Sequence, residues 1–174
     1  MSDEANDQDD DILEAPERGS VEELLDAGAQ DELGAMRHST AHVMAEAVME
    51  LFPGTKLGIG PAIRDGFYYD FLLPRALTPD DLAAIEARMA ESVAANHPFV
   101  LSELPPEEAR AFLVDQGQPL KVEIVDDLAA KTSAAGVPMP PTTFYRQGPF
   151  IDLCRGPHVA STGRIGPFKL LSVA

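Results

Sequence analysis

The stretch that decides the fold is LGAMRHSTAHVMAEAVMELFPG, residues 33–54. Its apolar side chains recur at spacings of three, four and seven, which predicts a helix with one buried face. These apolar positions are Met36, Val43, Ala47, Val48 and Leu51. Pro53 and Gly54 end the pattern, because neither residue readily continues a helix. The fold is therefore expected to start from an amphipathic helix.

The residues that follow predict strands and helices of uneven length. Residues 56–59 and 66–72 are typical of strands, and the second is rich in aromatic side chains. Thr78, followed by Pro79 and two aspartates, predicts the start of a helix that runs to about residue 97. A short strand over residues 99–101 and a further helix over residues 105–117 are expected next.

The last third of the chain predicts a hairpin. Residues 120–128 fit both a strand and a helix, since their apolar positions alternate and are also spaced by four. Residues 129–141, rich in alanine, proline and glycine, predict a loop. Residues 143–154 predict a hairpin with its turn at Gln147-Gly148, and residues 168–171 a last strand. The expected fold class is α+β, an antiparallel sheet packed with helices.

Charge is distributed unevenly along the chain. The formal net charge is −16, yet residues 1–32 hold 13 of the 29 acidic residues and a single base, Arg18. We therefore expect an acidic, largely disordered tail over residues 1–32, with one short capped helix from Ser20 to Gly28, and a folded domain over residues 33–174. Residues 145–174 carry four bases and one acid, so this end can meet phosphate.

Composition also narrows the compartment. A single cysteine cannot form an intramolecular disulfide, which favours a reduced, cytoplasmic protein. Apolar runs are broken too often to span a bilayer, so no membrane association is expected. The acidic start of the chain lacks the basic and apolar regions of a signal peptide and argues against a transit peptide.

Two pairs of metal-type donors have the same spacing. His38 and His42 lie one turn apart on one helix face, and Cys154 and His158 flank a Gly-Pro turn. Taken singly, each pair is more often an ordinary structural feature. Because three of the four histidines and the only cysteine fall into these two pairs, we expect one shared site. Ser39 follows the first histidine, where a zinc peptidase would need glutamate, which excludes that class.

The sequence resembles a known family. The runs RHSTAHVMAEAVMELFPGTKLGIGPAIRDGFYYDF (residues 37–71), QGPFIDLCRGPHV (147–159) and FKLLSVA (168–174) are similar to the editing domain of bacterial threonyl-tRNA synthetases and, more widely, of alanyl-tRNA synthetases. Two departures stand out. The acidic tail replaces the small ubiquitin-like domain that usually precedes this one, and the chain stops before the class II aminoacylation core. We therefore expect no ATP site and no aminoacylation by this chain alone.

The resemblance implies hydrolysis of mischarged Ser-tRNA(Thr). Serine lacks one methyl of threonine, and a pocket discriminates a methyl by only about 1–3 kcal/mol, so a second and smaller site is needed. The implied partners are the aminoacylated 3′ end of tRNA(Thr) and a synthetase core, in cis or in trans. A noncatalytic, zinc-bound module that binds tRNA or protein is the alternative.

The resemblance also implies roles for the site residues. His38 would position or deprotonate water, and His42 and His158 would orient water and ester, beside Cys154. Lys121 would stabilise the developing oxyanion or bind the leaving ribose oxygen, although a solvated surface lysine is an equal alternative from the sequence.

Further residues are carried over for substrate and tRNA. Asp152 would accept the ammonium group of the seryl moiety, and Tyr69 and Tyr145 would lie near the substrate. The cations expected to contact tRNA phosphates are Arg155, Arg164 and Lys169.

The sequence leaves open whether these residues bind a metal ion. His38, His42, Cys154 and His158 would fill a tetrahedral zinc shell, and a filled shell is structural. Alanyl-type relatives are zinc sites, whereas the threonyl type is usually taken to use ordered water. Catalysis without a cofactor is the favoured expectation, with zinc as the alternative.

Overall fold

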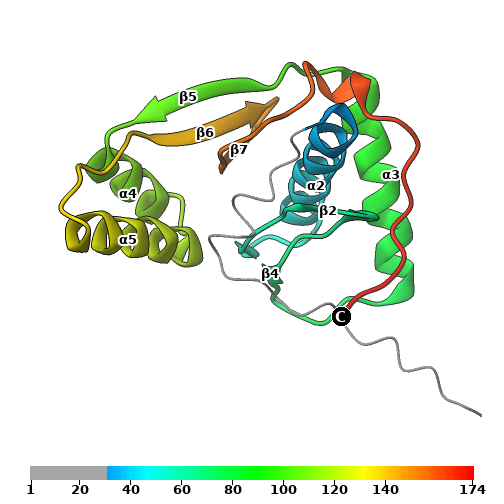
Figure 1. The fold of residues 1–174 in the computed structure, drawn as a ribbon. Coiled ribbons are helices and arrows are strands. Elements are labelled where there is room, and N and C mark those ends of the chain that lie inside the picture. Colours follow the sequence, from blue (N-terminus) through cyan, green and yellow to red (C-terminus); the bar gives the residue numbers. More distant parts are fainter. Residues whose placement is uncertain (1–30) are drawn as a thin grey trace, which may run out of the picture.

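The computed structural model describes residues 31–174 (Figure 1). The helix predicted from Ser20 lies outside the described residues, and so does the predicted acidic tail apart from its last two positions. Within the described part of the chain the fold is α+β, as predicted, with four α-helices and small antiparallel sheets. No helix in residues 31–174 is both long and apolar enough to cross a membrane.

Helix α2 (Glu32–Leu51) confirms the prediction from the opening stretch and begins one residue earlier than expected. The Asp31 side chain caps it by accepting a hydrogen bond from the Gly34 N–H at 2.8 Å. Both sides of the helix are covered, so that His38, His42 and Glu46 are buried together with Val43, Ala47 and Val48. Of the other predicted apolar positions, Met36 is half-buried and Leu51 is exposed. A helix buried this completely can place polar side chains only where they find partners.

The two strands predicted after α2 form as shorter pieces. β1 (Lys56–Leu57) pairs with β4 (Phe71–Leu72), and β2 (Ala62–Ile63) pairs with β3 (Gly66–Phe67), both antiparallel. Residues 58–61 contain two glycines and a proline, which interrupt the regular ladder. The interruption produces a loop over residues 59–62 that reaches the site described below.

Helix α3 (Pro79–Ala95) packs along α2 and ends at Asn96, which adopts the left-handed conformation with φ of 52°. Its predicted start is confirmed: Thr78 and Asp81 form a reciprocal capping box. Val48 of α2 meets Ile85 and Met89 of α3 in the largest buried apolar cluster. This packing fixes the helix that carries the two histidines.

A three-stranded antiparallel sheet forms the second half of the fold, in the order β5 (Val100–Leu104), β6 (Thr142–Gln147), β7 (Phe150–Leu153). The predicted hairpin is confirmed, since β6 and β7 pair from Phe144–Leu153 to Gln147–Phe150. Its turn lies at Gly148-Pro149, one residue later than predicted, because Gln147 still belongs to β6. Helices α4 (Pro106–Asp115) and α5 (Pro119–Ala134) pack together next to this sheet, and their buried side chains meet Phe144 (Figure 1).

Three sequence expectations are settled by these elements. Residues 120–128, which fitted both a strand and a helix, belong to α5. The loop predicted over residues 129–141 is wrong for residues 129–134, because the alanines there continue α5. The strand predicted over residues 168–171 is also wrong: within residues 31–174, the segment after the short helix η1 (Thr162–Arg164) has no ladder partner. Phe168 and Leu170 instead pack on the α2–α3 core.

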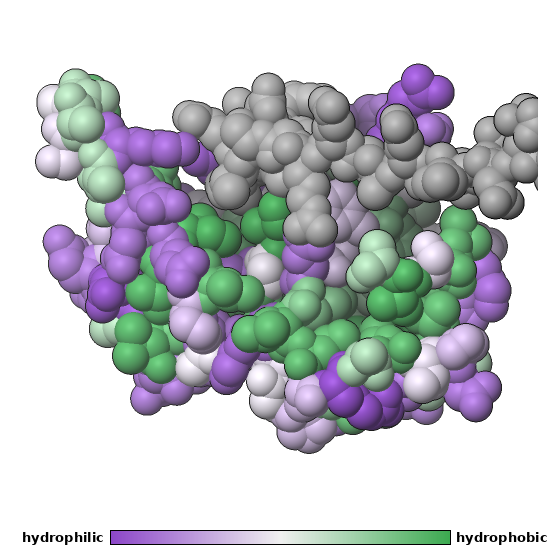
Figure 2. Space-filling model, turned by 90° about the horizontal axis from the view of Figure 1, so that it is seen from below, coloured by the Kyte–Doolittle hydropathy of each residue, from purple (hydrophilic) through white to green (hydrophobic). Residues whose placement is uncertain are grey.

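The surface does not present one continuous apolar face in the view from below. Figure 2 shows apolar patches interleaved with strongly polar ones on the described part of that face. Scattered apolar exposure of this kind is normal for a globular protein.

Candidate functional site

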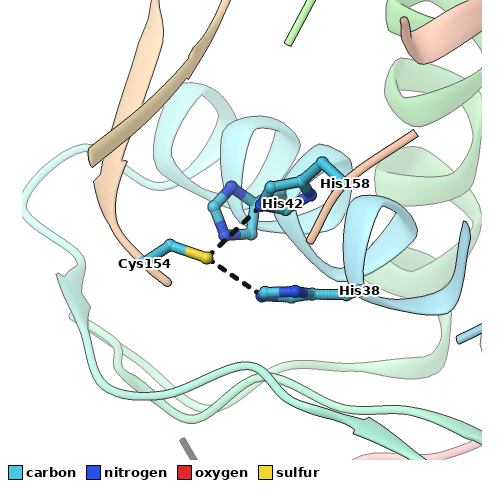
Figure 3. A group of neighbouring side chains, drawn as sticks. All are labelled: His38, His42, Cys154 and His158. Carbon is cyan, nitrogen blue, oxygen red and sulfur yellow. Dashed lines mark hydrogen bonds between the residues drawn. The ribbon is translucent and has the colours of Figure 1, made fainter. Parts of the chain in front are cut away.

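Three imidazoles and one thiol meet where α2 faces the end of β7 (Figure 3). One ligand atom from each of His38, His42, Cys154 and His158 lies within 4.8 Å of all the others. The Cys154 sulfur is 3.2 Å from His38 Nε2 and 3.3 Å from His158 Nε2. The two pairs recognised in the sequence thus form one cluster.

The turn after Cys154 brings His158 back towards the helix. Gly156 adopts a φ of 74°, and a Cβ atom there would lie 2.6 Å from the hydroxyl of Tyr145. Only glycine fits both the left-handed backbone and this close approach. The ring of His158 then packs against His38, with ring centroids 4.3 Å apart, and stacks on Phe99 at 4.6 Å.

The outer ring nitrogens of two histidines have acceptors that fix their tautomers. His38 Nδ1 lies 3.2 Å from the carbonyl oxygen of Pro157, which can only accept, so this nitrogen carries the proton. Ser39 Oγ donates to the Ala35 carbonyl at 2.8 Å and lies 2.9 Å from His158 Nδ1, which therefore donates to it. In both rings the lone pair of Nε2 faces the Cys154 sulfur.

Burial keeps the whole cluster neutral. Removal from water lowers the pKa of His38, lowers that of His42 well below its ordinary value and lowers that of His158 to about 2. The same cause raises the pKa of the Cys154 thiol to about 12. Near neutral pH the site therefore contains three neutral imidazole rings, each with one unprotonated nitrogen, and a protonated thiol.

This donor set fits a zinc ion. Zinc bonds of about 2.0–2.1 Å to nitrogen and 2.3 Å to sulfur place tetrahedral N and S ligands about 3.5 Å apart. The two N···S distances at Cys154, 3.2 and 3.3 Å, are close to this value. His38, His42, Cys154 and His158 would hold the metal. Such a full shell stabilises a fold, and its thiol must first lose its proton.

A buried ion pair lies beside the cluster. Lys121 of α5 and Asp152 of β7 are 3% and 4% exposed, and Lys121 Nζ lies 2.9 Å from Asp152 Oδ1. The alternative that Lys121 is a solvated surface lysine is therefore wrong. The Tyr69 hydroxyl donates to Asp152 Oδ2, and His42 Nε2 lies 3.8 Å from the same oxygen. Asp152 thus links helix α5, the segment between β3 and β4 that carries Tyr69, and the histidine cluster.

These groups line a small pocket with a cavity volume of about 40 Å³. One wall is the loop over residues 59–62, where a Cβ atom on Gly60 would lie 2.0 Å from the Tyr69 ring. The polar groups that line the pocket are His38, His42, Lys121, Asp152, Cys154 and Arg155. The remaining lining residues are small or apolar, among them Ile59, Pro61 and Ile124.

The other predicted residues lie in separate places. Tyr145 is beside the cluster, with its ring centroid 4.5 Å from that of His158. Arg155 lines the small pocket, whereas Arg164 lines a second hollow on the side of His158 towards the start of α2. Lys169 pairs with Glu86 of α3 at 2.7 Å. The three predicted tRNA cations therefore do not line one common pocket.

Sequence reasoning missed two residues that hold the cluster. Ser39 was noted only as the residue that excludes a zinc peptidase, yet it holds the His158 ring. Gln147 was noted only as part of a hairpin turn, yet it is fully buried and its amide contacts the backbone of His42 at 3.2 Å. The spacing within His-Ser-Thr-Ala-His offered a signal for Ser39, whereas nothing in the sequence marked Gln147.

Fold and site together define an α+β domain that gathers three imidazoles and a thiol beside a buried Lys–Asp pair. Residues 142–174 match the family described as "Threonyl and Alanyl tRNA synthetase second additional domain". The chain belongs to this family.

Its relatives include bacterial proteins named "Threonine--tRNA ligase". One from Dehalococcoides mccartyi is 52% identical over 82% of this chain, and one from Solidesulfovibrio magneticus is 47% identical over 91%. A third, from Wolbachia pipientis, is 46% identical over 87%. The chain spans only 23% of the length of each of these three relatives.

Proposed function

We propose that this domain hydrolyses the ester that joins serine to the terminal adenosine of mischarged tRNA(Thr). The observation that carries the proposal is the pocket, in which neutral imidazoles with inward lone pairs lie next to the Lys121–Asp152 pair. Kinship with threonine–tRNA ligases supports the choice of substrate, since those enzymes face the confusion of serine with threonine.

His38 is the proposed base for water. Its Nδ1 proton is held by Pro157, so Nε2, which faces the Cys154 sulfur, is the nitrogen that can accept a proton. The lowered pKa of His38 keeps this nitrogen unprotonated near neutral pH. The water oxygen attacks the ester carbonyl carbon, and His38 takes the proton. The bond from that carbon to the ribose oxygen then breaks, the ribose oxygen receives the proton, and serine and tRNA are released.

Lys121 and Asp152 are proposed to act on charge. The Lys121 ammonium lines the pocket, where a cation stabilises the oxyanion that forms during attack. Asp152 is the proposed acceptor of the seryl ammonium, and its carboxylate is held in place by Lys121 and Tyr69. His42 and His158, with Cys154, would complete the wall that orients water and ester.

The proposed partner is the 3′ end of tRNA(Thr), in the cytoplasm. Arg155 lines the pocket and would meet a phosphate near the ester. Arg164, which lines the second hollow, and Lys169, which pairs with Glu86, would contact the tRNA further away. The mischarged tRNA would come from a synthetase core that acts in cis or in trans.

A second candidate function rests on the same four donors. Because His38, His42, Cys154 and His158 match the ligands of a structural zinc ion, the domain would then be a noncatalytic module that binds tRNA or protein. Stoichiometric zinc in the purified chain, with loss of folding on chelation and no hydrolysis, would support this candidate.

The test of the proposed function is deacylation of seryl-tRNA(Thr) by the full chain. We expect hydrolysis well above the spontaneous rate, and a loss of about 10²-fold or more in Lys121→Met, as for removal of an oxyanion donor. Lys131→Met is the matched control, because Lys131 is an exposed lysine on the same helix. Melting temperatures of both variants show whether the fold is kept. Hydrolysis no faster than the spontaneous rate would overturn the proposal.

A further inference from the structure

Gln147 lies at the end of β6, outside the pocket but against the cluster. Its side chain is fully buried, and its amide nitrogen Nε2 donates to the backbone oxygen of His42 at 3.2 Å. A carbonyl oxygen only accepts, so this contact identifies which end of the amide is nitrogen. The other end, Oε1, is therefore an acceptor.

Within residues 31–174, two buried polar atoms at the Gln147–His42 contact lack a hydrogen-bond partner. Among the described residues, Gln147 Oε1 and His42 Nδ1 are both buried and have no hydrogen-bond partner within strict geometry. The two side chains are adjacent, and the Gln147 side chain interacts with the His42 ring. Buried polar groups are almost always paired, and a small adjustment that joins these two atoms satisfies both.

The contact determines which nitrogen of His42 is protonated. An amide oxygen can only accept, so Nδ1 must carry the proton if the two atoms pair. The opposite tautomer would place two lone pairs against each other at Gln147. It would direct its Nε2–H towards Asp152 Oδ2 at 3.8 Å, which is too long for a hydrogen bond.

We propose that Gln147 is a positioning residue that holds His42 as the Nδ1–H tautomer, with the Nε2 lone pair facing Asp152 and the cluster. The same arrangement then applies to all three imidazoles. Pro157 O holds His38 and Ser39 Oγ holds His158, each through Nδ1. Outer partners of this kind orient histidines both in water-activating sites and in metal sites.

The direct test is ¹⁵N NMR of the histidine rings in the full chain as purified. We expect a proton bonded to Nδ1 of His42, and its loss or exchange between both nitrogens in Gln147→Met, which removes the acceptor. Gln147→Glu keeps an acceptor oxygen and should retain the Nδ1 proton. The control is Thr142→Val, which removes another buried and unpaired polar atom from the same strand.

Activity gives the second readout, and only this arm rests on the proposed function. Deacylation should fall about 10-fold or more in Gln147→Met, in line with other losses of an outer partner, and stay unchanged in Thr142→Val. If the chain does not hydrolyse the ester at all, the NMR arm still decides the role of Gln147. An Nε2–H tautomer of His42 in the unmodified chain overturns the inference, even if Gln147→Met fails to fold. A folded Gln147→Met variant whose His42 spectrum is identical to that of the unmodified chain overturns it as well.

Discussion

Helix α2 contributes to two buried polar clusters, which differ in how their donors, acceptors and charges are paired. In its C-terminal half, Glu46 accepts from Ser92 Oγ at 2.6 Å and faces Arg88 Nη2 at 3.5 Å, both on α3. One to two turns earlier, His38 and His42 meet Cys154 and His158. In the first group, donors and opposite charges face an acceptor. In the second, lone pairs from neutral rings face one another and a thiol.

The difference separates a structural group from a functional one. The Glu46 group satisfies itself, and it ties α2 to α3 without a ligand. In the histidine cluster, burial and the neighbouring histidines lower the pKa of His42, so that a proton added to this ring is disfavoured. Strongly shifted pKa values in a buried cluster are typical of functional sites, so we expect these residues to bind water, substrate or metal.

The largest expected effect is on rate. His38→Ala should lower deacylation of seryl-tRNA(Thr) by about 10² to 10⁴, as for the loss of a general base, with nearly unchanged melting temperature. Rate, zinc content and melting temperature are measured on this one variant. Full activity would remove His38 from the mechanism. An inactive, zinc-depleted and unfolded variant would show that metal-free catalysis is wrong.

The opposite pattern is expected in the Glu46 group. Glu46→Ala removes the acceptor of the buried Ser92 hydroxyl, whereas Arg88 keeps its pair with Glu50. The free energy of unfolding should therefore fall by roughly 1–3 kcal/mol, the cost of a buried donor left without a partner. Urea unfolding measures the change, and deacylation by the folded fraction should be unaltered. A large loss of rate without a loss of stability would erase the contrast between the two groups.

Acid should weaken the fold through the histidine cluster. His38, His42 and His158 have pKa values below the ordinary 6.5, so the unfolded chain binds protons that the folded chain does not. The contribution of these histidines to stability should therefore be constant above about pH 6.5 and fall below it, by at most roughly 1.4 kcal/mol per pH unit and per histidine. For His158 this loss continues down to about pH 2.

Urea unfolding of the metal-free chain between pH 7.5 and 5 checks this prediction. His158→Asn should reduce the slope, and His97→Asn, a histidine substitution outside the cluster, is measured beside it. A slope that is the same in both variants would contradict the burial of neutral imidazoles.

The sequence predicted the elements whose signals are local. The spacing of apolar residues located α2, the Thr78 cap located the start of α3, and the Gln147-Gly148 turn located the β6–β7 hairpin. The strand predicted over residues 168–171 is wrong although Phe168 and Leu170 alternate with exposed residues as in a strand. Both side chains pack on helices, and no strand among the described residues lies beside them. Alternation reports on burial and does not supply a hydrogen-bonding partner.

The site was predicted where its residues lie in short motifs. The His38–His42 and Cys154–His158 pairs each mark a turn of chain, and their meeting followed from an unusual coincidence of donors. The Lys121–Asp152 pair joins two elements far apart in the sequence, so its burial could not be read from either neighbourhood. Gln147 acts through one amide contact across the fold, for which the sequence holds no pattern.

Selectivity tests the central claim most directly. The rates at which the full chain deacylates seryl-tRNA(Thr) and threonyl-tRNA(Thr) are compared under the same conditions. If the small pocket of about 40 Å³ is the proposed second sieve, the seryl ester should be hydrolysed at least 10-fold faster than the threonyl ester. Equal rates on the two esters would contradict the account.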